Sequence, residues 1–243
     1  MTAPVLLGLS GIEKRFGGLA VLTGVTLDVV PGEILGIIGK NGAGKTTLFN
    51  LICGLLRPNG GTLAFQGKDI RSLPPHLRAR RGIARTFQIP QPLPQLTTLE
   101  NVLVGALGRD SKIATARTHA VQAAQQCGLT YRLTAKAGAL TLPELKRLEL
   151  ARALATGPRL LLLDEVMSGL RHAEITETME LIREIRRSGV TVVLIEHVMH
   201  AVMGLCDRVT VLDQGGILTT GDPRSVMEDQ RVIDTYLGST HAA

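Results

Sequence analysis

Aromatic residues are scarce in this 243-residue chain, where they make up 2% of the sequence and include no Trp. Proteins that bind single-stranded nucleic acid stack bases on aromatic side chains, so we expect no nucleic-acid partner. With few aromatics, the core must be built from Leu, Val, Ile and Ala. A hydrophobic content of 44% beside 20% charged residues is ordinary for a globular protein, and a chain of this length can bury a sizeable core.

Signals for metal binding by cysteine and for membrane insertion are also missing. The three cysteines, Cys53, Cys127 and Cys206, lie far apart and form no CxxC pair, so we expect buried, reduced thiols and no zinc site. There is no run of about 20 apolar residues and no basic N-terminal region followed by an apolar stretch, so we expect neither a membrane span nor a secretion signal.

The net charge of +6 suits an anionic ligand or surface. The densest basic stretch, Arg78 to Arg85, is by itself typical of solvated surface.

Apolar patterns and turn signals predict an α/β fold. Residues 5–32 alternate apolar and polar positions, which predicts half-buried antiparallel strands. The continuous apolar run Ile34–Ile38 predicts a strand buried on both faces, followed by a glycine-rich loop and a helix over Thr47–Leu56. Strands and helices that alternate after such a loop indicate a mainly parallel sheet. The other predicted elements are a strand at Leu63–Phe65, a helical insertion over about 96–138 within a sub-lobe of about 90–140, strands at Arg159–Asp164, Val190–Glu196 and Arg208–Leu212, and a helix over about 173–188.

The glycine-rich loop reads Gly-Lys-Asn-Gly-Ala-Gly-Lys-Thr from Gly39 to Thr46 and matches the phosphate-binding pattern at every fixed position. In this pattern backbone N–H groups cradle phosphates, and the next helix directs its positive N-terminus at the same anion. Lys45 is expected to reach the outer phosphates, and Thr46 to ligate Mg²⁺. A dinucleotide-binding pattern is excluded because a third glycine would have to stand at Thr47. The residues expected to bind ATP in this loop are Gly39, Asn41, Gly42, Ala43, Gly44, Lys45, Thr46 and Thr47.

Two acids follow the predicted buried strand at Leu160–Leu163. Asp164 at the strand end can hold Mg²⁺, directly or through water, and Glu165 is placed to orient or deprotonate the attacking water. Such a run is often only a strand followed by a polar turn, but after a phosphate-binding loop it is a strong sign of a site that binds ATP with Mg²⁺ and hydrolyses it. A GTPase would carry an Asn-Lys-x-Asp guanine reader, and none is present.

The order of the phosphate loop, Gln88, Leu140–Leu154, Asp164-Glu165 and His197 resembles the ATPase subunits of ABC transporters over nearly the whole chain. The resemblance implies a single ABC ATPase domain over residues 1–243. It also implies that Gln88 contacts Mg²⁺ and the lytic water and senses a membrane partner, and that His197 touches the γ-phosphate. Phe16 stands in the place of the adenine-stacking aromatic, although an aromatic in a strand can equally belong to the core.

Leu140–Glu144 falls where this family has a Leu-Ser-Gly-Gly-Gln signature, an alignment fixed by the similar helix that follows. The resemblance implies that Thr141 reaches across a head-to-tail dimer to the partner's ATP. Here Leu142 adds bulk and Pro143 removes an N–H donor, which weakens the signature. Arg171 stands where the family has Asp or Asn, and it can pair with a phosphate or with an acid across the dimer. We therefore expect a heterodimer with a second ATPase subunit, with a homodimer as the alternative.

Several stretches resemble the branched-chain amino acid importer branch, which also includes urea and short-chain amide carriers: Lys14–Leu19, Ala84–Gln88, Ile195–His197 and the tail Val232–Gly238. The resemblance implies a peripheral protein on the cytoplasmic face of the inner membrane, with ATP and Mg²⁺ as cofactors. Its partners would be membrane permease subunits, a second ATPase subunit and, indirectly, an extracytoplasmic binding protein. The alternatives are an ABC-type ATPase of lipid export, a weakly hydrolysing regulatory partner, or a soluble ABC-type ATPase acting on DNA or ribosomes. The last usually has two such domains or a long coiled-coil insertion, and this sequence has neither.

Overall fold

The computed structural model describes residues 5–237, so Gly238 of the predicted tail lies outside the described part of the chain. The chain forms two compact units. Unit 1 combines two separate stretches of sequence, residues 5–75 and 191–237, and unit 2 is the continuous stretch 76–190 between them. The phosphate-binding loop and His197 lie in unit 1. Gln88, Asp164, Glu165 and Thr141 lie in unit 2.

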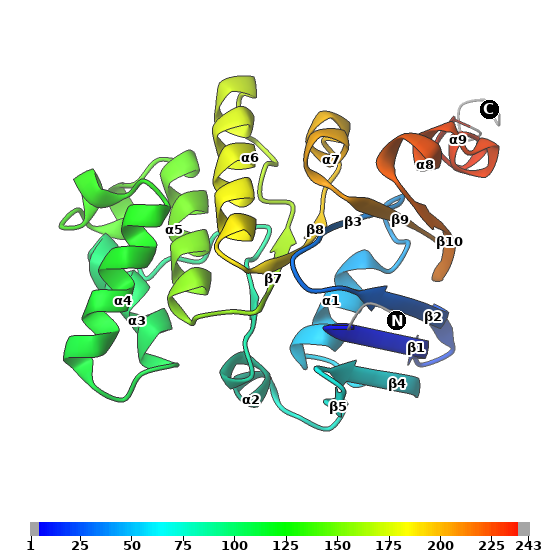
Figure 1. Cartoon of the computed structure of the whole chain (residues 1–243), viewed down its shortest axis with the longest axis horizontal. Coiled ribbons are helices and arrows are strands. Elements are labelled where there is room, and N and C mark those ends of the chain that lie inside the picture. The colour runs from blue at the N-terminus through cyan, green and yellow to red at the C-terminus, as the bar shows by residue number, and fades with distance from the viewer. Residues whose placement is uncertain (1–4, 238–243) are drawn as a thin grey trace. The chain divides into compact units, whose positions relative to one another are not determined.

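Unit 1 begins with an antiparallel sheet, as the alternation over residues 5–32 predicts (Figure 1). Leu7, Leu9 and Ile12 lie on its buried face, while polar residues of the same strand face outward. The strand predicted at Leu63–Phe65 begins three residues earlier, at Gly60. The strands of this sheet, in spatial order, are β2 (Leu19–Val29), β1 (Leu7–Phe16), β4 (Gly60–Phe65) and β5 (Lys68–Asp69).

A second set of strands in unit 1 is mainly parallel, which confirms the predicted sheet type. Here β3 (Ile34–Ile38) is parallel to both β8 (Thr191–Ile195) and β9 (Arg208–Asp213), and β10 (Gly216–Gly221) is antiparallel to β9. All five residues of β3 and all five of β8 are buried. The continuous apolar runs therefore mark strands that are covered on both faces.

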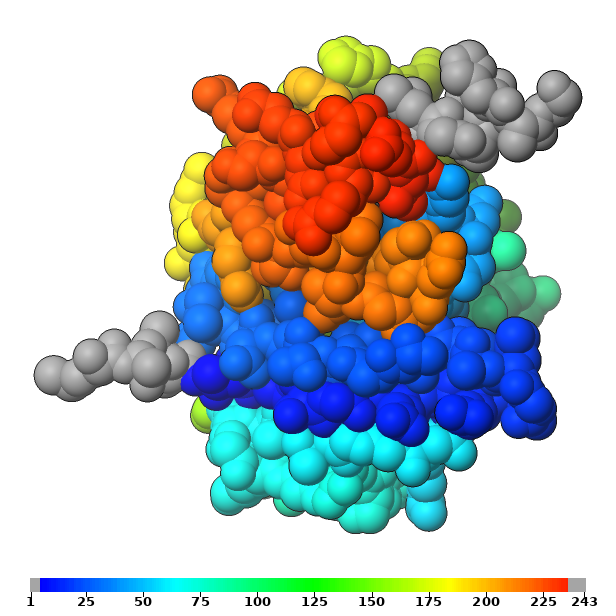
Figure 2. All heavy atoms as spheres, turned by 90° about the vertical axis from the view of Figure 1, so that its right-hand side faces the viewer, coloured from blue at the N-terminus to red at the C-terminus, as the bar shows by residue number. Residues whose placement is uncertain are grey.

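The helices of unit 1 are α1 (Lys45–Cys53), α7 (Met199–Leu205), α8 (Pro223–Glu228) and α9 (Gln230–Leu237). The predicted bounds of α1, Thr47–Leu56, were wrong at both ends. The helix begins two residues earlier, at Lys45, and ends before Gly54, whose left-handed conformation (φ 82°) stops it. Figure 2 shows a face of unit 1 on which the orange and red C-terminal segment lies above the blue N-terminal strands; β10 is the part of that segment that packs against β2, and α8 and α9 pack against β10.

Unit 2 contains the predicted helical insertion. Its helices α3 (Thr98–Leu107), α4 (Ile113–Gln126) and α5 (Leu142–Ala155) pack on one another through small residues. Among these, Ala116, Ala120 and Ala124 on α4 are fully buried. Gly105 on α3 allows the closest approach, because a Cβ there would lie 2.3 Å from the carbonyl oxygen of Arg152 on α5. The elements are α2 (Pro75–Arg80), β6 (Ile83–Arg85), α3 (Thr98–Leu107), α4 (Ile113–Gln126), two 3₁₀ turns (Thr130–Arg132 and Ala137–Ala139), α5 (Leu142–Ala155), β7 (Leu160–Asp164) and α6 (His172–Arg187).

Two expectations about polar and sulfur-containing residues need correction. The basic stretch is not simply solvated surface, because Arg78 is 1% exposed. Cys127 and Cys206 are buried as expected, but Cys53 is half-buried, and no disulfide joins the three cysteines within the described chain. Among the described helices, none is long and apolar enough to cross a membrane.

Candidate functional site

The phosphate-binding loop leaves β3 and turns tightly into α1. Two of its glycines are required by close packing. A Cβ at Gly39 would lie 2.1 Å from the carbonyl oxygen of Leu212, and a Cβ at Gly44 would lie 2.6 Å from Cδ2 of Leu22. A Cβ at Gly42 would meet no neighbouring atom, but this residue has φ 83°, a backbone conformation that disfavours residues other than glycine. The loop conformation therefore depends on all three glycines.

Lys45 is the first residue of α1, and its side chain lies inside the loop. The residue is 6% exposed, and its ammonium donates to the carbonyl oxygens of Gly39 (2.6 Å) and Lys40 (3.0 Å). Thr46 is exposed and Thr47 half-buried, and with Lys45 they supply the N–H groups of the first helical turn. The first N–H groups of a helix point along its axis at the N-terminus, which is where phosphate-binding loops place the anion. Asn41 and Gly42 form the exposed rim of the loop, and Ala43 is buried beneath it.

His197 lies at the same edge of unit 1 as the loop. The parallel register pairs Ile37 of β3 with Ile195 of β8, so Gly39 and His197 each stand two residues beyond a paired position. Neighbouring strands are about 4.8 Å apart, which brings both residues to the carboxyl edge of adjacent strands. His197 is exposed, while Glu196 before it is 1% exposed. His197 is therefore an exposed residue at the sheet edge that the loop also reaches.

Phe16 ends β1 and is a surface residue. It is 46% exposed, and the ammonium of Lys14 lies 5.0 Å from its ring centroid. Lys14 pairs with Leu22 of β2, the residue that contacts Gly44, so the end of β1 lies on the loop side of unit 1. The surface position favours a role in ligand contact over a role in the core.

In unit 2, Gln88 and Glu165 are in direct contact although 77 residues separate them. The Gln88 amide donates from Nε2 to Oε2 of Glu165 at 2.7 Å. Glu165 follows β7 with φ 48°, a left-handed conformation that is unusual for a residue other than glycine. Such backbone strain clusters at functional sites, where the surrounding structure holds it in place. The two residues form one polar pair, here called the Gln88–Glu165 pair.

Asp164 lies directly before this pair and is bound to a buried arginine. Its carboxylate accepts a hydrogen bond from Nη2 of Arg85 at 2.6 Å, and both side chains are less than a tenth exposed. The parallel pairing of β6 with β7 brings the two together, since Arg85 stands opposite Leu162. The Asp164 N–H donates to the hydroxyl of Thr86 at 3.3 Å. Asp164 therefore sits in a well-defined position at the end of its strand.

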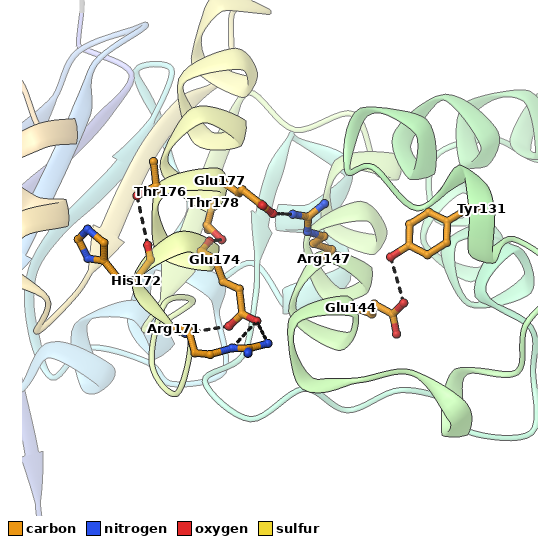
Figure 3. Close-up of polar contacts among 9 residues, drawn as sticks. All are labelled: Tyr131, Glu144, Arg147, Arg171, His172, Glu174, Thr176, Glu177 and Thr178. Atoms are coloured by element: carbon orange, nitrogen blue, oxygen red, sulfur yellow. Dashed lines mark hydrogen bonds and ion pairs between the residues drawn. The ribbon is translucent and has the colours of Figure 1, made fainter.

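Thr141 is the N-cap of α5, and its hydroxyl is occupied within the helix. The hydroxyl donates to Oε2 of Glu144 at 3.0 Å, and the Thr141 N–H donates to the same oxygen at 2.8 Å. Figure 3 shows Tyr131 directed at Glu144, whose Oε1 accepts from the Tyr131 hydroxyl and from Nε of Arg132. Burial by itself would raise the pKa of Glu144, but these donors together lower it to about 2.

Pro143 is the second residue of α5. An N–H at this position has no partner within a helix, so proline fits there without loss of a helical hydrogen bond. Leu142 is 42% exposed, and a Cβ at Gly169 would lie 3.3 Å from its Cδ2. Both substitutions in the signature-like segment are thus compatible with a regular helix start.

Arg171 precedes α6 and pairs within its own chain, an arrangement that the sequence did not indicate. Its side chain is 87% exposed, and Nε and Nη2 both donate to Oε1 of Glu174 (Figure 3). A neighbouring pair joins Arg147 to Glu177. These pairs line a groove of about 500 Å³ between the first turns of α5 and α6, within unit 2.

Sequence reasoning missed Arg85 as the partner of Asp164, and it missed Lys146 altogether. Lys146 is 8% exposed and donates from Nζ to the carbonyl oxygens of Gln88 (2.7 Å) and Glu165 (3.1 Å). The available signal was weak, since Arg85 stands three residues before Gln88 and Lys146 two residues after Glu144. Neither spacing indicates a partner so far away in the sequence.

Comparison with known proteins gives a consistent result. The ABC transporter family model matches residues 22–168. The chain is 37% identical to the high-affinity branched-chain amino acid transport ATP-binding protein BraF of Pseudomonas aeruginosa, over 98% of this chain and 99% of that protein. It is 34% identical to the lipopolysaccharide export system ATP-binding protein LptB of Acidithiobacillus ferridurans, over 96% and 97%. A crystal structure of a nucleotide-free ATP-binding cassette from an ABC transporter matches with a TM-score of 0.88 at 31% identity, over 96% of this chain and 99% of that one.

Proposed function

Because this chain belongs to the ATP-binding proteins of ABC transporters, in which ATP hydrolysis is coupled to transport, we propose that it drives an importer of branched-chain amino acids or related small amides. Subunits of this family work with membrane permease subunits. The substrate class is supported by 37% identity to BraF over 98% of the chain. In this proposal residues 1–243 act as a single ABC ATPase domain, with residues of about 90–140 as its helical sub-lobe.

ATP binds at the loop Gly39–Thr46, and Mg²⁺ accompanies its phosphates. No group of three or more His, Cys, Asp or Glu within residues 5–237 could hold a metal ion alone. That fits Mg²⁺ in a nucleotide site, because there the ion takes one or two protein oxygens and otherwise binds phosphates and water. The Thr46 hydroxyl, the Asp164 carboxylate and the Gln88 amide oxygen supply such ligands, since the Gln88 hydrogen bond to Glu165 uses only the amide nitrogen. Phe16 is proposed to stack on the adenine.

The observation that carries the proposed mechanism is the 2.7 Å hydrogen bond of the Gln88–Glu165 pair. It holds the Glu165 carboxylate in a fixed place beside Gln88, where a carboxylate can orient a water and accept its proton. The water oxygen then bonds to the γ-phosphorus as the bond to the bridging oxygen breaks and ADP leaves. Lys45 stabilises the charge that spreads over the phosphoryl oxygens, where a Mg²⁺ held by Thr46, Asp164 and Gln88 would supply further positive charge, and His197 contacts the γ-phosphate.

We further propose that the chain works beside a second, different ATPase subunit on the cytoplasmic face of the inner membrane. The Thr141 hydroxyl donates a hydrogen bond to Glu144, and Pro143 has no N–H. The signature-like segment therefore offers few donors to a partner's nucleotide, and a partner with a full signature would complement the intact loop of this chain. An extracytoplasmic binding protein would deliver the substrate to the permease.

Purification of the tagged chain from membranes of its own organism tests this function. We expect two different permease subunits and a second ATPase subunit to co-purify, and ATP hydrolysis by the complex in vesicles to rise when a branched-chain amino acid and its binding protein are supplied. The matched control is the same complex carrying Lys45→Ala, in which the loop loses its ammonium and the stimulation disappears.

The relationship to LptB favours lipid export as the second candidate. Recovery of a lipopolysaccharide-export permease would establish that candidate and remove the importer. Recovery with ribosomes or nucleic acid and no membrane protein would contradict transport altogether.

A further inference from the structure

Lys146 is a buried cation in the second turn of α5. Charged lysines are rarely buried, because an ammonium group loses its hydration and must be compensated by hydrogen bonds. This residue is 8% exposed and stands five positions after Thr141, so about 7.5 Å of helix separates the two. Its side chain therefore reaches into the interior of unit 2 from a position two residues after the signature-like segment.

The ammonium of Lys146 joins the backbones of the two residues proposed to act in hydrolysis. Nζ donates to the carbonyl oxygen of Gln88 at 2.7 Å and to that of Glu165 at 3.1 Å. The side chains of the same two residues contact each other at 2.7 Å. One cation and one side-chain hydrogen bond thus define the relative position of Gln88 and Glu165.

The backbone of Glu165 needs such support. Its φ of 48° is unfavourable for a residue with a Cβ and persists only where neighbours hold it. An ammonium carries three donors and can serve two carbonyls at once, whereas a neutral aliphatic side chain of the same length serves neither. A loss of the cation would let the Gln88 loop and the turn at Glu165 relax independently.

We propose that Lys146 is a positioning residue for ATP hydrolysis, which holds the backbones of Gln88 and Glu165 so that their side chains stay in catalytic contact. Because it stands on α5, it also links the first turn of that helix, Thr141–Glu144, to the pair. A movement of α5 on docking against a partner's nucleotide is then passed to both carbonyls. The proposal rests on the proposed role of the Gln88–Glu165 pair.

Turnover by the purified transporter complex with Lys146→Met, Lys146→Gln or Lys146→Arg tests the proposal. We expect kcat to fall about 10-fold or more in Lys146→Met, with KM for ATP changed less than about 3-fold, because the ATP-binding loop is elsewhere. Lys146→Arg should recover much of the rate, since a guanidinium can donate to both carbonyls, and Lys146→Gln should lie between. Lys136→Met, at an exposed lysine of the same unit, is the control and should match the unmodified complex.

A double-mutant cycle with Glu165→Gln separates positioning from a general loss of stability. Glu165→Gln alone should lower kcat by about 10²–10⁴-fold. If Lys146 acts through the pair, adding Lys146→Met to Glu165→Gln should lower the residual rate by less than about 3-fold. Fully additive losses, or wild-type kcat in both Lys146→Gln and Lys146→Met, would overturn the proposal. Unchanged turnover in Glu165→Gln alone would instead refute the proposed role of the pair, which is a different failure.

Discussion

Glu144 stands where the resemblance leads one to expect glutamine, and it does what a neutral amide cannot. Its carboxylate accepts from the Thr141 N–H and hydroxyl and from Tyr131 and Arg132. An amide has a single acceptor oxygen, so one set of these donors would face an NH₂ group. The charge at Glu144 therefore stabilises the start of α5 directly.

Replacement of Glu144 by Gln should lower stability in a pH-dependent way. The folded-state pKa of about 2 lies below the ordinary value of 4.5, so the carboxylate contributes stability above about pH 4.5 and loses it as pH falls towards 2. We expect Glu144→Gln to cost on the order of 2–3 kcal/mol at pH 7, with the difference shrinking below pH 4.5. Urea unfolding of both proteins between pH 7 and pH 3 measures it. Glu180→Gln, at an exposed pair on α6, should change little at any pH, and a Glu144 effect that stayed constant with pH would contradict the assignment.

At the scale of the helix, α5 tolerates a proline because of where it falls. Thr141 and Glu144 form a capping box around the first turn, and Pro143 lies inside that turn. The sequence correctly indicated that an N–H donor is lost. It did not show that the helix itself is unaffected, because that depends on where the helix begins.

Pro143→Ala should therefore lower the free energy of unfolding by less than about 1 kcal/mol, because alanine gives the unfolded chain more conformational freedom than proline does. Ala151→Pro, in the buried middle of the same helix, should cost about 3 kcal/mol or more, since it removes a helical hydrogen bond and introduces a clash. Thermal and urea unfolding of the two variants gives the comparison. Equal costs would show that α5 does not begin at Leu142.

Much of the fold was predictable element by element, and the reasons are local. The buried strands β3 and β8 are continuous apolar runs, and α3 lies within the predicted helical insertion, where Thr97 and Glu100 form a capping box before an apolar stretch. The end of α1 was missed because its limit is set by one glycine conformation at Gly54. Patterns give the type of an element better than its last residue.

In the candidate site, the contacts between residues were harder to predict from the sequence than the residues themselves. The sequence placed Gln88 in the site through resemblance and Glu165 through its position after a buried strand, while the contact between the two spans 77 residues. Arg85 belonged to the basic stretch that looked like surface, and Lys146 drew no prediction, because their partners Asp164 and Gln88 lie 79 and 58 residues away. Pairing of β6 with β7 and packing of α5 create these contacts, and no local pattern encodes them.

At the scale of the whole molecule, the proposed pairing with a different ATPase subunit predicts weak activity for the chain alone. Two copies would each present a signature-like segment in which Thr141 is engaged and Pro143 has no N–H. A missing donor at a charged phosphate costs about 1.5–3 kcal/mol, which corresponds to a factor of roughly 10 to 150 in rate. We expect the purified chain to turn over ATP at least about 10-fold more slowly than the assembled transporter.

Addition of the second ATPase subunit to the purified chain is the control for this prediction. It should restore turnover, while addition of more of the same chain should not. Turnover by the chain alone equal to that of the assembled transporter would rule out the asymmetric pair and favour a homodimer.

The discontinuous path of the chain through unit 1 has a consequence for its synthesis. The N–H of Gly32, just before β3, donates to the hydroxyl of Thr191, which lies 159 residues further along the chain. At about 5–20 residues per second, a ribosome needs roughly 8 to 30 s to make that stretch. During this time β3, whose five residues are all buried in the finished protein, has neither β8 nor β9 beside it. The continuous segment 76–190 is complete before these strands meet, so the nascent chain carries β3, an apolar strand, without either of its sheet partners until translation is nearly over.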